Sequence, residues 1–261
     1  MNTNPYATSD QSETAYFTDD ITLLPLSAIW RICRRLGLTG WVLVFPLFTV
    51  RKLLGWTYPA NHATCRPDGL NFIAPHELSA DEASGLANLE DACRALGMQP
   101  LGIFRPPWIG RKSGVFELWL HPSRRLYCNL AYISLSLGKF HKSKAIFACH
   151  SKLATGLEFH TSSMDPEDWI PELIPPGHDL APLPAGLAPA EVIEHHLARI
   201  ADQGEVLELD GDAACRLIVE STQRQIDFSW DRGFLRRIGE SELAELRSLS
   251  HPDTLPGSES R

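Results

Sequence analysis

The sequence predicts an α+β fold: an antiparallel meander sheet of four or five strands, flanked by helices and preceded by an apolar helical hairpin. Three observations support this fold. Apolar runs between residues 100 and 162 are joined by connections too short to contain helices, so neighbouring strands must run antiparallel. Helical periodicity lies on both sides of these runs, and an apolar segment with basic flanks lies near the N-terminus.

These segments divide the 261-residue chain into four parts. Residues 1–20 hold four acidic and no basic residues, unlike a secretory signal peptide, and we expect them to form a disordered acidic tail. The helical hairpin occupies residues 21–58 and the α+β domain residues 60–250, and residues 251–261 form a second disordered tail.

The hairpin segment contains no acidic residue between positions 21 and 60. Its first helix is expected from about Pro25 to Leu36, and its second from about Thr39 to Leu54, each followed by a glycine that ends it. The uncharged run from position 36 to 50 is shorter than the roughly 20 helical residues that cross a bilayer, and Pro46 interrupts it.

We expect this hairpin to contact the cytoplasmic face of a membrane, because interfacial tryptophans and cations suit anionic headgroups. Two alternatives stay open: a hairpin packed on the domain, and a true membrane span. Trp108 joins the contact set because it lies among three cations at an expected hairpin tip, although it can instead fold back onto the core. The expected contact residues are Trp30, Arg31, Arg34, Arg35, Trp41, Arg51, Lys52, Trp56 and Trp108.

The first helix of the domain has clear boundaries. Ser79 and Glu82 form a capping box, and Gly97 supplies the stop after Leu96. Between them, apolar residues recur at helical spacing, so one face of this helix should cover the sheet.

Five strands are expected next, separated by loops such as residues 105–114 and 138–143. They run over Pro100–Phe104, Val115–His121, Leu126–Leu135, Lys144–Lys152 and Gly156–Ser162.

The C-terminal third is expected to be helical after a long loop. Residues 163–189 are rich in proline and predict an extended loop that wraps the domain. Pro189 then begins a helix that ends at Gly204, a helical region follows over residues 212–238 with a break near Gly233, and a short helix runs over residues 240–249.

One hairpin can be registered from the sequence. A three-residue loop that ends at Gly156 pairs Lys152 with Glu158, and His150 with His160. The two histidines then lie directly across a strand pair, where imidazoles can share a transition metal. Cross-strand histidines on a polar face are more often plain surface residues, and the sequence places no third ligand.

Other candidates for chemistry are sparse. His178 and Asp179 lie in the long loop, where functional residues often collect, whereas His196 lies on an apolar helix face and is expected in the core. The six cysteines show no zinc-type spacing and are expected as reduced thiols, and no motif indicates a cofactor.

Charge is unevenly distributed along the chain. Residues 101–152 hold nine Lys and Arg against one Glu, and residues 153–212 hold thirteen Asp and Glu against one Arg. The net charge of −8 argues against a nucleic-acid binder. The basic block still leaves a third reading open, in which it binds an anion or a nucleic acid. The adjacent acidic block weakens this reading.

The leading functional expectation is a membrane-associated interaction or binding module on the cytoplasmic side, whose partner is an anionic membrane surface or a membrane protein. The alternative is a small-molecule hydrolase or metal-dependent enzyme that uses the face of His150 and His160, with His178 in the loop above it. A cavity lined by buried titratable groups favours the enzyme, and a flat sheet face favours the module.

Overall fold

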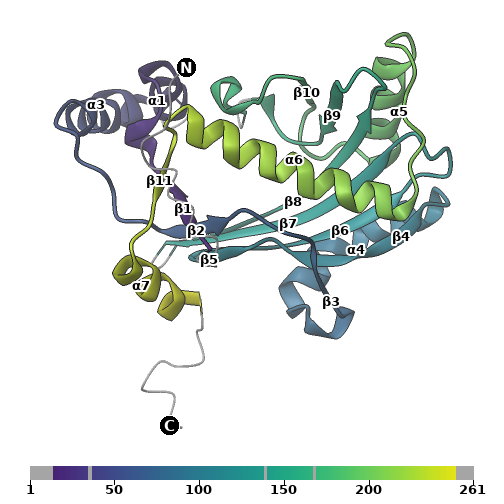
Figure 1. Cartoon of the computed structure of the whole chain (residues 1–261), viewed down its shortest axis with the longest axis horizontal. Coiled ribbons are helices and arrows are strands. Elements are labelled where there is room, and N and C mark those ends of the chain that lie inside the picture. The colour runs from purple at the N-terminus through teal and green to yellow at the C-terminus, as the bar shows by residue number, and fades with distance from the viewer. Residues whose placement is uncertain (1–13, 35–36, 138–139, 167–168, 251–261) are drawn as a thin grey trace, which may run out of the picture.

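The computed structural model describes residues 14–34, 37–137, 140–166 and 169–250, and within them the chain forms two sheets and a set of helices (Figure 1). The larger sheet has seven strands in the order β10–β9–β8–β7–β6–β4–β3. These strands are β3 (Asn71–Ile73), β4 (Gln99–Arg105), β6 (Lys112–Leu120), β7 (Tyr127–Leu137), β8 (Phe140–Lys152), β9 (Glu158–Ser162) and β10 (His178–Pro182).

The antiparallel meander is confirmed, since β4, β6, β7, β8 and β9 are the five predicted strands and pair antiparallel in that order. The prediction of four or five strands is too low, because β3 and β10 extend the sheet at its two edges. β10 lies within the segment predicted as an extended loop and runs parallel to β9, with His178 opposite Glu158. No local sequence pattern indicates that this segment pairs with β9, so the strand was missed.

A second, four-stranded sheet was not predicted at all. It has the order β11–β1–β2–β5 and consists of β1 (Tyr16–Asp19), β2 (His62–Cys65), β5 (Trp108–Gly110) and β11 (Leu235–Arg237). The residues of β1 were assigned to a disordered tail, and those of β5 to a loop. Both expectations are wrong, because strands of three or four residues are held here by partners distant in sequence, such as Phe17 opposite Arg237. Residues 1–13 and the C-terminal tail lie outside the described residues.

Two helices cover one face of the large sheet, as predicted. α4 (Ala80–Ala95) begins at the predicted capping box, in which the Ser79 hydroxyl accepts from the backbone N–H of Glu82, and α5 (Pro189–Ile200) begins at Pro189. Leu86 of α4 and Val192 of α5 are fully buried in one cluster with Trp119 of β6 and Phe147 of β8.

The opposite face of the sheet is crossed by a long helix, α6 (Gly211–Asp231), which Figure 1 shows lying over the strands. Its first half packs Ala214 and Leu217 on Leu118 and Tyr127 of the sheet. α6 ends before Gly233, where a break was predicted, and the predicted short helix is α7 (Glu240–Ser250). The predicted continuation of the helix to residue 238 is wrong, because residues 235–237 pair with β1 as strand β11.

The N-terminal segment is helical, but the predicted hairpin is not confirmed. It contains α1 (Leu26–Arg34), a short α2 (Gly37–Thr39), a π-helix η2 (Gly40–Val44) and α3 (Phe45–Leu53). Residues 35–36, at the end of the first predicted helix, lie outside the described residues, and the predicted turn at Gly37 falls in α2. α1 contributes Ile29 and Cys33 to a buried cluster that also receives Phe45 and Phe48.

Candidate ligand-binding site

The hairpin between β8 and β9 has the predicted register. His150 lies opposite His160 and Lys152 opposite Glu158, and Gly156 takes a φ of 90° in the three-residue loop. That conformation is unstrained only for glycine, so the sequence specifies this loop locally. Because Tyr127 lies opposite His150 on the next strand, three neighbouring strands bring their side chains to the α6 face together.

Aromatic rings form a continuous stack on this face. The rings of Tyr127 and His150 are parallel at 4.7 Å, those of His150 and His160 lie 4.0 Å apart, and Trp169 meets His160 edge-on at 5.6 Å. The structure also brings His178 beside them, because β10 extends the sheet next to β9. The histidines are therefore in a covered cluster and are not plain surface residues.

This cluster lines a cavity of about 650 Å³ beneath the second half of α6. That volume lies within the range of about 300–1,000 Å³ usual for small-molecule sites. Most of its wall is apolar: it includes Ile21, Leu24, Ile32, Trp108, Trp169, Ile170, Leu173, Pro175, Leu180, Ile226, Phe234 and Leu235.

Burial keeps the histidines of the cluster neutral. It lowers the pKa of His150 well below its usual value, with the neighbouring His160 adding to the effect. It lowers the pKa of His160 to about 3, and it lowers the pKa of His178 while Glu158 acts in the opposite direction. Neutral imidazoles offer one N–H donor and one nitrogen acceptor each.

Three polar atoms in the cavity wall have no hydrogen-bond partner among the described residues. They are Nε2 of His150, Nε2 of His178 and the indole Nε1 of Trp169. Leaving a buried donor or acceptor unpaired costs about 1–3 kcal/mol each. Their gathering in one cavity makes this cavity the candidate binding site.

A balanced ion-pair group closes the cavity at this end. Glu158 pairs with Arg224 of α6 and with Lys152 at 3.4 Å, and its second oxygen lies 3.4 Å from His178 Nε2. Lys152 also reaches Glu220 at 3.7 Å. Two cations therefore face two anions, so this end carries no net charge when His178 is neutral.

A second charged group lies in another part of the wall. Lys112 places its ammonium 4.0 Å above the ring of Trp108, and burial lowers the pKa of Lys112 while Asp19 opposes the shift. Asp19 pairs with His62 at 2.6 Å.

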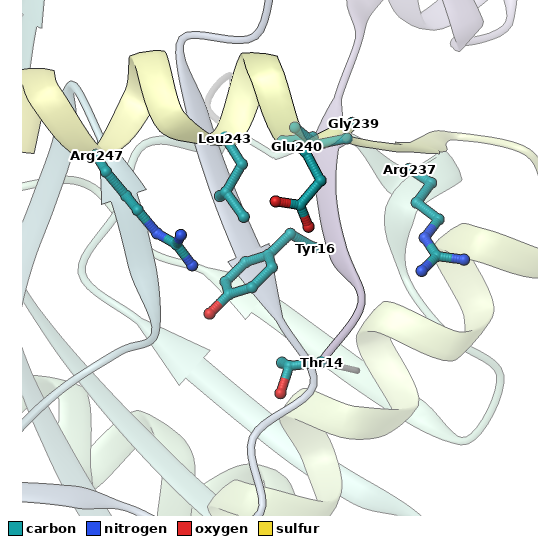
Figure 2. Close-up of a pocket in the computed structure, with 8 residues that line it drawn as sticks. Thr14, Tyr16, Arg237, Gly239, Glu240, Leu243 and Arg247 are labelled. Atoms are coloured by element: carbon teal, nitrogen blue, oxygen red, sulfur yellow. The ribbon is translucent and has the colours of Figure 1, made fainter. Parts of the chain in front are cut away.

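Another pocket, of about 620 Å³, lies between β1 and α7 (Figure 2). Tyr16, Leu243 and Arg247 line it beside Glu240, as Figure 2 shows, and histidine and cysteine do not occur among its described lining residues. Thr14 at its rim is the first residue after the N-terminal segment that is left undescribed. The cavity under α6 is the better candidate, because its wall holds the unpaired polar atoms.

The residues expected at the membrane fall into two groups. Trp41 and Trp56 are exposed, whereas Trp30 is half-buried against Trp41, and Arg35 lies outside the described residues. Trp108 lies in the connection between β4 and β6, but there it forms β5 and lines the cavity, which matches the alternative that it folds back onto the protein.

The cations of this segment mostly contact the protein itself. Arg31 lies 3.5 Å from Glu172, and Lys52 donates to the backbone oxygen of Thr22 at 2.8 Å. Arg51 stacks 4.0 Å above the ring of Tyr58, and Arg34 lies 5.6 Å from that of Trp30.

The other candidate residues from the sequence lie outside the histidine cluster. Asp179 is exposed and pairs with Arg199 at 3.0 Å, away from the adjacent His178. His196 is the predicted core histidine, with Nδ1 2.9 Å from Thr161 and Nε2 2.8 Å from Ser151.

All six cysteines are free. Metal binding by His150 and His160 stays a prediction, and the described residues contain no group of three or more ligands placed to hold a metal.

Several cavity residues carried no signal in the sequence. Trp169, Lys112 and Asp19 come from three distant segments, and Ser221 and Gln225 come from the polar side of α6. A polar stripe of Ser221, Thr222, Gln225 and Ser229 on a helix that otherwise packs on a sheet was the one usable hint.

Comparisons with known proteins add no further constraint: no family model, no curated protein and no solved structure matches the chain.

Proposed function

We propose that this protein is a membrane-associated binding module that inserts the outer face of α2, η2 and α3 into the interfacial layer of a bilayer and holds a small molecule under α6. The observation that carries the membrane part is an uncovered apolar surface. Of the fifteen large hydrophobic side chains exposed in the described part of the chain, ten belong to residues 26–56. Clusters of this kind on a protein surface mark interaction sites.

Four of these ten exposed residues form one stripe along η2 and α3. Leu43, Leu47, Val50 and Leu54 follow each other at intervals of four, three and four residues, the spacing of one helix face, and each is more than half exposed. The opposite face, with Phe45 and Phe48, packs on the protein. α3 also carries Arg51 and Lys52, but within the described part of the chain its apolar stripe has no cover.

A lipid surface fits this face better than a charged protein surface. The segment carries no acidic residue, and Trp41 and Trp56 flank the stripe as interfacial aromatic residues do. Among the described helices, none is both long and apolar enough to cross a bilayer. The proposed contact is therefore interfacial, on the cytoplasmic side that the basic residues of this segment favour.

Vesicle flotation with matched variants tests the proposal. Leu43→Gln with Leu47→Gln removes apolar area without adding charge, and we expect it to lower the vesicle-bound fraction at least tenfold, because burying one leucine contributes about 1.5–3 kcal/mol. Leu96→Gln with Leu249→Gln changes two other exposed leucines and should leave binding unchanged. Equal vesicle binding by the two double variants would overturn the proposal.

One observation favours a second candidate, the small-molecule hydrolase or metal-dependent enzyme. His178 lies beside His150 and His160 in a cavity with buried titratable groups, the arrangement that the enzyme requires. Within the described residues, however, none of these three histidines hydrogen-bonds to a serine, threonine or cysteine that would act as nucleophile, so binding is the function better supported. Stoichiometric zinc, copper or nickel in untagged protein, lost in His150→Ala, would support the enzyme.

A further inference from the structure

We infer that the cavity under α6 binds an uncharged amphiphile, with a hydroxyl or carbonyl oxygen at the His150–His178–Trp169 end and an apolar chain toward α1. This inference deepens the proposed function and rests on it in one respect, the membrane as the source of the ligand.

The polar end of the cavity requires an oxygen atom from its ligand. The indole N–H of Trp169 can only donate, so its partner must be an acceptor. The Nε2 atom of His150 is also buried and has no hydrogen-bond partner among the described residues, whereas that of His178, whose side chain is only 10% exposed, makes no hydrogen bond but lies 3.4 Å from a Glu158 oxygen. A hydroxyl can accept from the indole and donate to an imidazole nitrogen, whereas a carbonyl accepts from the indole and an imidazole N–H.

The charge of the described residues around this end disfavours an ionic head group. The carboxylate of Glu158 is already paired with Arg224 and Lys152, and those two cations are also engaged by Glu220. The described charged groups in the rest of the wall have contacts of their own, because Asp19 pairs with His62, Asp20 accepts from Thr22, and Lys112 lies above the ring of Trp108. A buried charge without a partner is costly, and an uncharged head avoids that cost.

The apolar wall leads from the histidines toward the membrane-facing segment. Leu24 and Phe234 belong both to the cavity wall and to the buried cluster that holds α1 and α3 on the protein. Ile32 of α1 lines the same wall. A chain that enters from the bilayer surface therefore meets apolar side chains along its path before its head reaches the polar end.

Three ten-carbon probes distinguish this inference from binding at other surfaces. 1-Decanol, decanoate and decylammonium share one chain and differ in the charge of the head. Isothermal titration of the full chain, below the concentration at which each probe aggregates, should give one site for 1-decanol and at least tenfold weaker binding of both ions. Absence of 1-decanol binding, or equal affinity for all three, would overturn the inference.

Substitutions locate the head group. Trp169→Phe keeps the ring and removes only the N–H, and it should weaken 1-decanol binding about threefold to tenfold, the loss of one hydrogen bond. Trp56→Phe is the matched control, since Trp56 is exposed and is not among the residues that line the cavity. The affinity of this variant for 1-decanol should change less than twofold. Ser221→Leu fills the cavity from α6 and should reduce affinity at least tenfold. Unchanged affinity in both cavity variants, with melting temperatures like that of the parent protein, would contradict the assignment.

The two proposals fail separately in these measurements. The Leu43→Gln, Leu47→Gln protein should still bind 1-decanol in solution, because neither residue lines the cavity. If the Leu43→Gln, Leu47→Gln protein floats with vesicles as the parent does, but the cavity variants lose 1-decanol binding, only the membrane contact is refuted. If that double variant no longer floats with vesicles, but the cavity variants bind 1-decanol normally, only the ligand site is refuted.

Discussion

Two histidines on opposite faces of the large sheet, His196 of α5 and His150 of β8, show how hydrogen bonding separates a structural side chain from a binding one. His196 is fully buried, and both of its ring nitrogens have hydroxyl partners, in Thr161 and Ser151. His150 projects from the other face of the sheet, and its Nε2 has no partner within the described part of the chain. The role of His196 could be predicted from helix periodicity, but that of His150 depends on what covers its face.

A buried carboxyl group should make stability depend on pH. Burial, with a further contribution from Glu90 beside it, raises the pKa of Glu117 to about 7. Because the folded pKa lies above the unfolded value of about 4.3, the stability that this group contributes is fully present below about pH 4 and is lost as pH rises through about 7.

Glu117→Gln should therefore stabilise the protein at pH 8 by on the order of 2 kcal/mol and change little at pH 5. Urea unfolding at the two pH values measures the difference. Glu194→Gln, at an exposed position on α5, serves as the control and should show no such pH dependence. A gain for Glu117→Gln that is the same at both pH values would contradict the assigned cause.

At the scale of elements, α4 depends on a glycine for its approach to the sheet. A Cβ at Gly85 would overlap the ring of Tyr132 on β7. Gly85→Ala raises helix propensity by about 1 kcal/mol, but the overlap forces helix and strand apart, and overpacking typically costs about 1–3 kcal/mol. We expect a net loss of stability of about 1 kcal/mol by thermal unfolding. Tyr132→Leu should reverse the effect in the double variant, and a stabilised single variant would show that the helix can shift freely.

Elements were predictable where neighbours in sequence are also neighbours in space. The register of the β8–β9 hairpin was predicted correctly because Lys152, Gly156 and Glu158 lie close together in sequence, around the hairpin loop. The second sheet was missed because its strands pair across long separations, as between Phe17 and Arg237. No local periodicity develops in strands of three or four residues.

The candidate site was predictable in part for the same reason. The pairing of His150 with His160 followed from the hairpin, whereas the contribution of His178 required the parallel pairing of β10 with β9. A parallel strand joined through a long proline-rich connection leaves no register signal in the sequence. Trp169 and the polar stripe of α6 join the site only through tertiary packing.

At the scale of the whole molecule, the chain places its apolar excess in one region. The α6 face of the sheet supplies a cavity, and the segment from α1 to α3 forms part of its wall while leaving its own outer face uncovered. Near each end of the basic block of residues 101–152, a cation forms an ion pair with a carboxylate of the protein: Arg105 pairs with Glu82, and Lys152 pairs with Glu158. These two cations are therefore not free to bind an anion. The third reading, anion or nucleic-acid binding, is thereby weakened further.

Removal of the N-terminal segment would be an unsuitable test of membrane contact for this fold. A chain that begins near Ala60 would lack β1, which pairs with both β2 and β11, and Ile29, which is fully buried. Exposed-face substitutions on the full chain avoid this loss of the core.

The central claim is that apolar burial, with only a small contribution from charge, holds the protein on a membrane. Arg31, Arg51 and Lys52 already contact protein groups, so screening by salt should matter little. The most direct measurement is flotation of the full, detergent-free chain with vesicles of neutral phosphatidylcholine in about 1 M NaCl, where the Debye length is about 3 Å. The account predicts that the protein floats with these vesicles. A monomeric protein that stays in the bottom fraction, with or without added anionic lipid, would contradict it and would make the segment from α1 to α3 an ordinary part of the folded domain.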